Sequence, residues 1–168
     1  YVVVNLVSSS LFLIILATVY SATGTVNLAQ LAERLPGLPV DLQTAIQALM
    51  LTVFGIKAAI FPLAAWLPDS YPTAPAPVTA VFAGLLTKVG VYAILRTQTL
   101  LFPERPLTTL LLVIAGLSML VGIFGAIAQS ELKRMLSFTL ISHIGYMIFG
   151  IALNTTDLVE PFATAWQR

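Results

Sequence analysis

The amino-acid sequence predicts an all-α membrane protein with about five transmembrane helices. Hydrophobic residues make up 58% of the 168 residues and charged residues only 9%, whereas soluble domains usually carry about 25% charged residues. The apolar residues gather in about five stretches of roughly the 20 residues that a helix needs to cross a bilayer. One stretch contains Pro62, which predicts a broken helix because proline removes a backbone hydrogen bond and clashes with the preceding turn.

The expected helices are separated by short polar connections rich in glycine and proline. The connection QSELKR is so short that the two helices it joins must be antiparallel neighbours. The polar tail from residue 154 onward is expected to be a loop that leads to further helices. In order, the elements are a span over 2–22, a short interfacial helix over 28–35, and spans over 42–67, 77–97, 107–128 and 135–153.

Composition excludes several kinds of function. The net charge of +1 argues against a nucleic-acid partner, which requires clustered Lys and Arg on an accessible surface. The absence of cysteine excludes disulfides and thiolate metal sites, and one histidine with few carboxylates leaves almost no metal ligands. We therefore expect no metal and no cofactor. The chain has no initiator Met and is apolar from its first residue, so we interpret residues 1–168 as one partial membrane domain of a longer protein.

Two lysines are the main candidates for function because each lies near the middle of an apolar span. Placing a lysine at that depth costs about 2.5–3.5 kcal/mol on insertion scales, and such residues usually mark ion pathways. Pro62 and Gly55 flank Lys57, and broken helices provide ion sites in transporters. The alternative is a lysine whose long stem reaches the interface. Lys57 lies about 13–15 Å from either end of its span, too far for that reach.

Lys88 lies in the next span, among small residues that allow close helix packing and leave room for water: Gly84, Thr87 and Gly90. The same alternative applies to this lysine. None of the five expected spans contains Asp or Glu. Since desolvation disfavours the charged form of a lysine, the two side chains fit a proton relay, and a carboxylate from a helix outside this chain could switch Lys57 between charged and neutral states.

His143 is the third candidate, as the single histidine and near the middle of the last span. Histidine accepts and returns protons near neutral pH. A neutral histidine bonded to a neighbouring helix is the alternative reading. Asp69 could collect protons at the surface, although a turn-forming Asp is commoner, and Trp66 and Tyr71 fit an interfacial aromatic belt.

The connections distribute the charged residues over both membrane sides. Alternating spans place Asp69, Lys133 and Arg134 on one side, and Arg34, Arg96 and Arg105 on the other. The difference in Lys and Arg is too small for the positive-inside rule to decide the orientation.

Two segments resemble a known family. The strings KAAIFPLAAWLPDSYPTAPAPVTAVFAGLLTKVGVYAILR and ELKRMLSFTLISHIGYMIFG are similar to the proton-translocating membrane subunits shared by respiratory complex I and the Mrp-type multisubunit Na⁺/H⁺ antiporters. The shared pattern is a lysine before a helix break, WLPD, a Pro/Ala-rich turn, a second lysine, and a helix with KR followed by S-H-x-G-Y. The turn is more similar to the antiporter members of the family than to those of complex I.

The resemblance implies a fold of about 14 helices built on two inverted five-helix repeats, of which this chain matches the sixth to tenth helices. Lys57 then falls on the broken seventh helix, Lys88 on the eighth and His143 on the tenth, as members of a hydrated proton path along the mid-plane. It also implies a multi-pass location in the cell (inner) membrane, other membrane subunits as partners, and a glutamate partner for Lys57 on a helix before residue 1.

The favoured function is thus an ion-translocating subunit of a multisubunit Na⁺(cation)/H⁺ antiporter, with H⁺ and Na⁺ as the ions and lipid around it. One alternative is a proton-pumping subunit of complex I or of a membrane-bound hydrogenase. In that case it would belong to an oxidoreductase, although no redox or hydrolytic site is evident in the chain. Another alternative is a scaffold subunit that transports nothing and whose lysines bridge helices.

Overall fold

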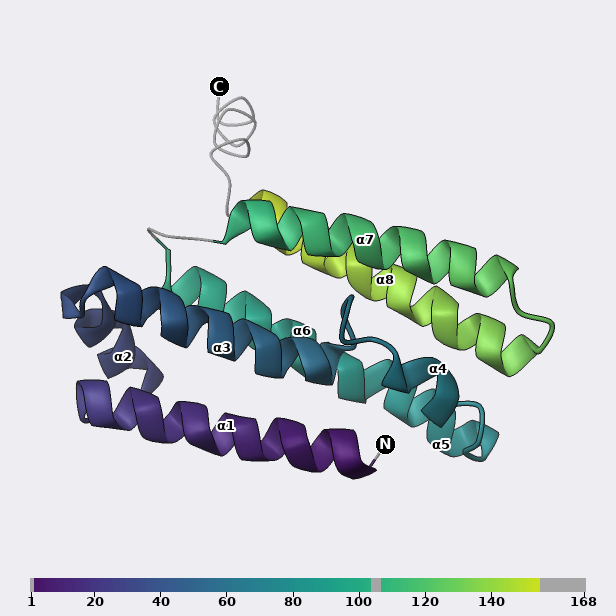
Figure 1. Cartoon of the computed structure of the whole chain (residues 1–168), viewed down its shortest axis with the longest axis horizontal. Helices are drawn as coiled ribbons and strands as arrows, with labels where there is room; N and C mark the ends of the chain where they lie inside the picture. The colour runs from purple at the N-terminus through teal and green to yellow at the C-terminus, as the bar shows by residue number, and fades with distance from the viewer. Residues whose placement is uncertain (1, 104–106, 155–168) are drawn as a thin grey trace, which may run out of the picture.

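The computed structural model describes residues 2–103 and 107–154. These residues are almost wholly helical and contain no strand. The long helices lie roughly side by side, with α1, α3 and α6 in one group and the α7–α8 hairpin along the other side (Figure 1). The predicted all-α membrane class is confirmed. The predictions for the polar tail and for Arg105 lie outside the described residues.

The first helix, α1 (Val2–Thr23), is mostly apolar and is followed by a glycine. Gly24 takes the left-handed conformation (φ 71°), which favours glycine because it lacks a Cβ. The short helix α2 (Leu28–Arg34) begins at Asn27, whose side-chain oxygen accepts the Ala29 N–H at 3.0 Å. A 3₁₀ turn, η1 (Leu35–Gly37), leads from α2 into α3.

The span expected over 42–67 is interrupted in the structure. It consists of α3 (Val40–Ala58), a non-helical turn, and the short α4 (Trp66–Ser70). Ala59 follows α3 with a left-handed backbone (φ 57°, ψ 50°), a common way to end a helix. The predicted break near Pro62 is confirmed, and it begins at Ala59, before the proline itself.

The span expected over 77–97 is one continuous helical stretch, but two parts of it are wound as π-helix. It runs through α5 (Ala76–Val81), the π-helical segment η2 (Phe82–Leu86), α6 (Thr87–Arg96) and a second π-helical segment, η3 (Thr97–Leu101). Nothing in the sequence predicts either π segment. Such segments are rare and frequently occur at functional sites.

The last two helices, α7 (Thr108–Ile127) and α8 (Leu132–Asn154), form the predicted antiparallel hairpin. Glycines bring them together: a Cβ on Gly122 would lie 2.5 Å from the backbone N of Ser142. An ion pair of 3.0 Å joins Arg134 at the start of α8 to Asp69 in α4. This pair confirms that both residues lie at the same end of the bundle.

Four described stretches are long and apolar enough to cross a membrane, and the fifth predicted span is the interrupted one. Buried apolar side chains form one core among α3, α6, α7 and α8, and a second among α1, α2, α3 and η3. The four stretches are Val2–Thr23, Pro77–Leu101, Thr108–Ile127 and Leu132–Leu153.

Candidate functional site

Lys57 lies in the last turn of α3 and reaches toward α1. Its Nζ donates a hydrogen bond of 2.8 Å to Oδ1 of Asn5. The side chain borders a cavity of about 330 Å³ between α1, α3 and α6. The lining is mostly apolar, and its members are Asn5, Ser9, Phe12, Val53, Phe54, Lys57, Leu86, Val89, Gly90 and Ala93.

Side chains from two other helices stabilise the break that follows Lys57. Trp66 Nε1 donates to the Ile56 carbonyl at 3.0 Å. Ser118 of α7, fully buried, accepts the Phe61 N–H at 2.9 Å. Because backbone groups left without partners inside a membrane are costly, these bonds allow the break to exist. The sequence suggested an interfacial role for Trp66 and gave no signal for Ser118.

Lys88 lies at the centre of the long helical stretch, directly after the π segment η2. Its Nζ donates to the carbonyl oxygen of Ala83 within η2, at 2.7 Å. The adjacent carbonyl, that of Phe82, accepts the hydroxyl of Tyr71 at 3.2 Å. Tyr71 is buried, so it is not part of an interfacial belt. The π segment thus presents two carbonyls to side chains, one of them to the lysine.

A shallow groove between α6 and α8 contains Lys88. The groove and the Lys57 cavity share no lining residue and lie on different faces of α6. The groove is lined by Lys88, Val91, Tyr92, Leu95, Met147, Gly150 and Ile151.

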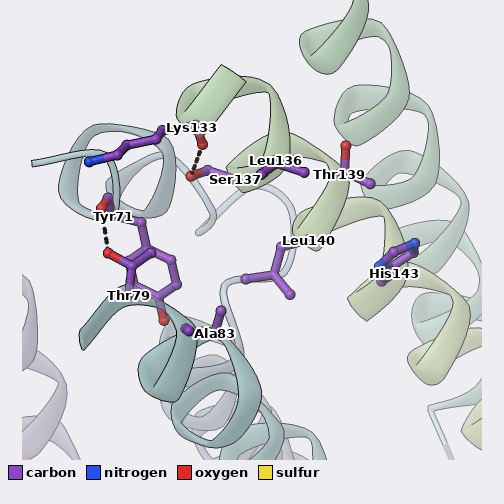
Figure 2. A pocket seen from close by; sticks show the side chains of 10 residues that line it. Tyr71, Thr79, Ala83, Lys133, Leu136, Ser137, Thr139, Leu140 and His143 are labelled. Carbon is purple, nitrogen blue, oxygen red and sulfur yellow. Dashed lines mark hydrogen bonds between the residues drawn. The ribbon is translucent and has the colours of Figure 1, made fainter. Parts of the chain in front are cut away.

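His143 borders a third cavity, of about 370 Å³, between α5, η2 and α8. Its imidazole is exposed to this space and makes no hydrogen bond to another described residue. The bonded histidine considered from the sequence is therefore absent from the described part of the chain. Figure 2 shows His143 and Lys133 on opposite sides of the lining, with Leu140 and Ala83 between them.

The three candidate residues line three different spaces. Ala83 accepts the bond from Lys88 through its carbonyl and also lines the His143 cavity, but Lys88 itself is not among the lining residues of that cavity. Lys57 lies on the other side of α6. There, Gly90 packs so closely on α3 that an added Cβ would be 2.6 Å from the Ala58 nitrogen.

A buried hydroxyl beside Lys88 has no partner. Thr52 and Thr97, like other helical threonines of this chain, donate to the carbonyl four residues earlier. For Thr87 that carbonyl belongs to Ala83, which accepts Lys88 instead. The Thr87 hydroxyl is fully buried and without a hydrogen bond among the described residues, a situation that ordinarily costs free energy.

Among the residues that the structure describes, no carboxylate lines the Lys57 cavity or the Lys88 groove. Within residues 2–103 and 107–154, no group of three or more His, Asp or Glu side chains could hold a metal ion. The chemistry of the described site is therefore that of basic side chains, amides, hydroxyls and backbone carbonyls.

These features define a multi-pass membrane protein with an interrupted helix and basic side chains that line spaces between its helices. The family model described as "NADH:quinone oxidoreductase/Mrp antiporter, TM" matches residues 1–164. The chain belongs to this family, as the resemblance of its motifs implied.

Two relatives with known names support this family membership. The chain is 46% identical over 158 residues to the D subunit of the Na(+)/H(+) antiporter of Alkalihalophilus pseudofirmus, covering 92% of this chain and 32% of that protein. It is 41% identical over 163 residues to the protein of the same name from Bacillus subtilis, covering 95% of this chain and 33% of the relative. The chain thus spans about a third of the length of these relatives.

Solved structures agree with the fold. A chain in the Mrp complex from Dietzia sp. DQ12-45-1b superposes with a TM-score of 0.84 at 37% identity, over 91% of this chain and 28% of that one. A chain of the membrane-bound sulfane sulfur reductase, an archaeal respiratory membrane complex, gives a TM-score of 0.83 at 32% identity, over 90% and 32%. Both relatives are subunits of larger membrane assemblies.

Proposed function

We propose that this chain is the central part of an ion-translocating subunit of a multisubunit Na⁺/H⁺ antiporter. It works with other membrane subunits, surrounded by lipid, and carries H⁺ in exchange for Na⁺ or a similar cation. Lys57, Lys88 and His143 are the proton-relay residues, and Pro62 belongs to the helix break beside Lys57. Identity of 46% to the D subunit of an antiporter, over nearly the whole chain, is the observation that carries the proposal.

The arrangement of basic side chains supports a relay in two sections. Ala83 accepts the bond from Lys88 and also lines the His143 cavity, so the proton passes between these two side chains by way of Ala83 and water in that cavity. Lys57 has its own cavity on the other face of α6. Transfer between the two sections then passes the α3–α6 contact at Gly90, either by water or by a movement of the helices.

A second candidate function is a proton-translocating subunit of a respiratory complex. It is favoured by the likeness to the membrane-bound sulfane sulfur reductase, at 32% identity, and by the family description, which includes NADH:quinone oxidoreductase. In that case, electron transfer in partner subunits, rather than a sodium gradient, would drive the protons.

The test uses inside-out membrane vesicles from cells that produce the complete protein with its partner subunits. A pH gradient is established, and its dissipation on adding NaCl is followed with a fluorescent dye. The antiporter function predicts Na⁺-dependent dissipation that Lys57→Ala and Lys88→Ala lower at least about tenfold, since each would remove a relay group. Arg96→Ala is the matched control, because Arg96 is also a basic residue but is exposed at the end of α6 and lines neither the Lys57 cavity, the Lys88 groove nor the His143 cavity.

Three other outcomes contradict the proposal in different ways. Proton movement that requires an electron donor, and not Na⁺, would favour the respiratory function. Full transport in both Lys57→Ala and Lys88→Ala would contradict the relay. Loss of the assembled complex in these variants, with normal transport per assembled complex, would indicate the scaffold role.

A further inference from the structure

The strongest unassigned feature is the buried hydroxyl of Thr87, which has no hydrogen-bond partner among the described residues. The residue is 0% exposed, and it borders none of the spaces beside Lys57, Lys88 and His143. Neither a water molecule nor a side chain from another part of an assembly therefore has access to the hydroxyl. Its lack of a partner follows from the packing of the described helices themselves.

The winding of the helix explains why Thr87 lacks the usual acceptor. A helical threonine can donate to the carbonyl four residues earlier, and four is the spacing of an α-helical turn. For Thr87 that carbonyl belongs to Ala83, which lies in the π segment η2. It accepts instead from Lys88, five residues later, which is the spacing of a π-helix. The threonines whose acceptor lies in an α-helix all make the usual bond: Thr18, Thr23, Thr44, Thr52, Thr97, Thr99 and Thr139.

We propose that the Ala83 carbonyl accepts from Lys88 and from Thr87 in turn, and that Thr87 is thereby a positioning residue for the lysine. The role in transport rests on the proposed relay function. In the conformation described above, the carbonyl accepts from Lys88 at 2.7 Å. In a second conformation, the turn from Ala83 to Thr87 takes α winding and Thr87 Oγ1 donates to the carbonyl. The lysine amine then turns into the groove between α6 and α8, which its side chain already borders.

This exchange keeps the two conformations close in free energy. A backbone carbonyl without a donor inside a membrane is costly, so Lys88 alone could leave Ala83 only at that cost. Thr87 removes the cost, because its hydroxyl makes the bond that the lysine gives up. The unpaired hydroxyl in turn raises the free energy of the first conformation. A relay lysine has to move between partners, and here the carbonyl keeps one donor before and after the movement.

The test is a double-mutant cycle on the thermal unfolding of the complete complex in detergent. Thr87→Val keeps the shape of the side chain and should raise the unfolding temperature of the parent protein, because it removes an unpaired hydroxyl. In Lys88→Met no ammonium group competes for the Ala83 carbonyl, so the Thr87 hydroxyl should bond to it. There, Thr87→Val should lower the unfolding temperature, and this change of sign is the coupling between the two residues.

Thr97→Val is the matched control for the cycle. Thr97 is a buried threonine of the same helical stretch, and its hydroxyl is already bonded to the Ala93 carbonyl. Its substitution should lower the unfolding temperature equally in the parent protein and in Lys88→Met.

Transport provides the second measurement. Na⁺-dependent dissipation of the pH gradient in inside-out vesicles, divided by the amount of assembled complex on immunoblots, should fall about fivefold in Thr87→Val. This is the effect of one lost hydrogen bond on the population of a conformation. Thr87→Ser keeps the hydroxyl and should transport like the parent protein, and so should Thr97→Val. A residue with a purely structural role would not combine higher stability with lower transport.

Three outcomes would overturn the inference: an effect of Thr87→Val on unfolding that is the same in the parent protein and in Lys88→Met, unchanged transport in Thr87→Val, or an equal loss of transport in Thr87→Ser. If Thr87→Val does not assemble, Thr87→Ala also lacks the hydroxyl, and the difference between its effects in the two backgrounds decides. A failure of the proposed function appears separately, as full transport in Lys88→Ala.

Discussion

Two interruptions of helical structure lie beside Lys57 and Lys88, both half-buried, and the backbone carbonyls at the two interruptions are paired in different ways. After Lys57 the helix α3 stops, and the Ile56 carbonyl in its last turn is taken by Trp66. Before Lys88 the helix only widens into a π segment, and the Ala83 carbonyl is taken by the lysine itself.

Because of this difference, the two lysines and the interruptions beside them find their hydrogen-bond partners in different parts of the molecule. The break after Lys57 needs α4 and α7 to pair its backbone, and its lysine turns to a side chain of α1. Lys88 finds its partner within its own helical stretch. We therefore expect the position of the Lys57 side chain to depend on how several helices pack together. The position of the Lys88 side chain should depend mainly on the π-helical segment of its own helix.

The α3–α6 contact holds the two interruptions side by side, and breaking it should have the largest effect on stability. An added Cβ at Gly90 would lie 2.6 Å from the Ala58 nitrogen and 2.9 Å from the Phe54 oxygen. Backbone atoms cannot rotate away, so Gly90→Ala should destabilise the protein by about 3 kcal/mol, the upper end for overpacking. Thermal unfolding of the detergent-solubilised complex measures this.

Gly84→Ala is the control for that experiment, because nothing lies within 4 Å of the position that its Cβ would occupy. It should leave the unfolding temperature unchanged or slightly raised. Equal unfolding temperatures for the two variants would show that α3 and α6 are not in tight contact at Gly90.

The two aromatic donors provide a direct comparison of the interruptions. Trp66→Phe removes the indole N–H from the Ile56 carbonyl and reduces packing beside the break, so we expect a loss of about 2 kcal/mol. Tyr71→Phe removes one hydroxyl from the Phe82 carbonyl and should cost about 1 kcal/mol. Chemical denaturation and transport assays on both variants test this order. Trp66 pairs the break after Lys57, and Tyr71 pairs the π segment before Lys88. A larger loss of transport in Tyr71→Phe than in Trp66→Phe would therefore contradict the view that Lys57 depends more than Lys88 on contacts with other helices.

The hydroxyl of Thr87, unpaired among the described residues, should give an effect as small as that of Tyr71→Phe and of opposite sign. Thr87→Val keeps the shape and removes a buried group without a partner, so we expect a stabilisation of about 1 kcal/mol. Thr97→Val is the control, because the Thr97 hydroxyl is bonded to the Ala93 and Ile94 carbonyls, and its loss should destabilise by about 1 kcal/mol. Destabilisation of similar size in both variants would mean that a water molecule pairs Thr87.

Most of the fold could be predicted from the sequence, because membrane spans depend on length and hydrophobicity along the chain. Pro62 predicted the break, and the short connection at 129–134 predicted the α7–α8 hairpin. The π segments could not be predicted in the same way. They differ from an α-helix by a shift in backbone pairing that carries no strong residue signature, unlike the proline near the break.

The partners of the candidate residues were also beyond the sequence. Lys57, Lys88 and His143 stand out because charge is rare in apolar spans. The pairing of Lys57 with Asn5, and of the break with Ser118, depends on how each helix is rotated about its axis. Helix α1 is apolar on nearly all sides, so its sequence does not indicate which face meets α3.

The early end of α3 has an electrostatic consequence for Lys57. The aligned peptide dipoles of a helix give its C-terminus a charge equivalent to about −0.5, and a cation in the last turn gains about 0.3–2 kcal/mol from it. Lys57 is the basic residue in that last turn, whereas Lys88 lies inside a stretch that continues beyond it in both directions. The end of α3 thus acts as a fixed partial negative charge beside a lysine whose cavity contains no acidic side chain.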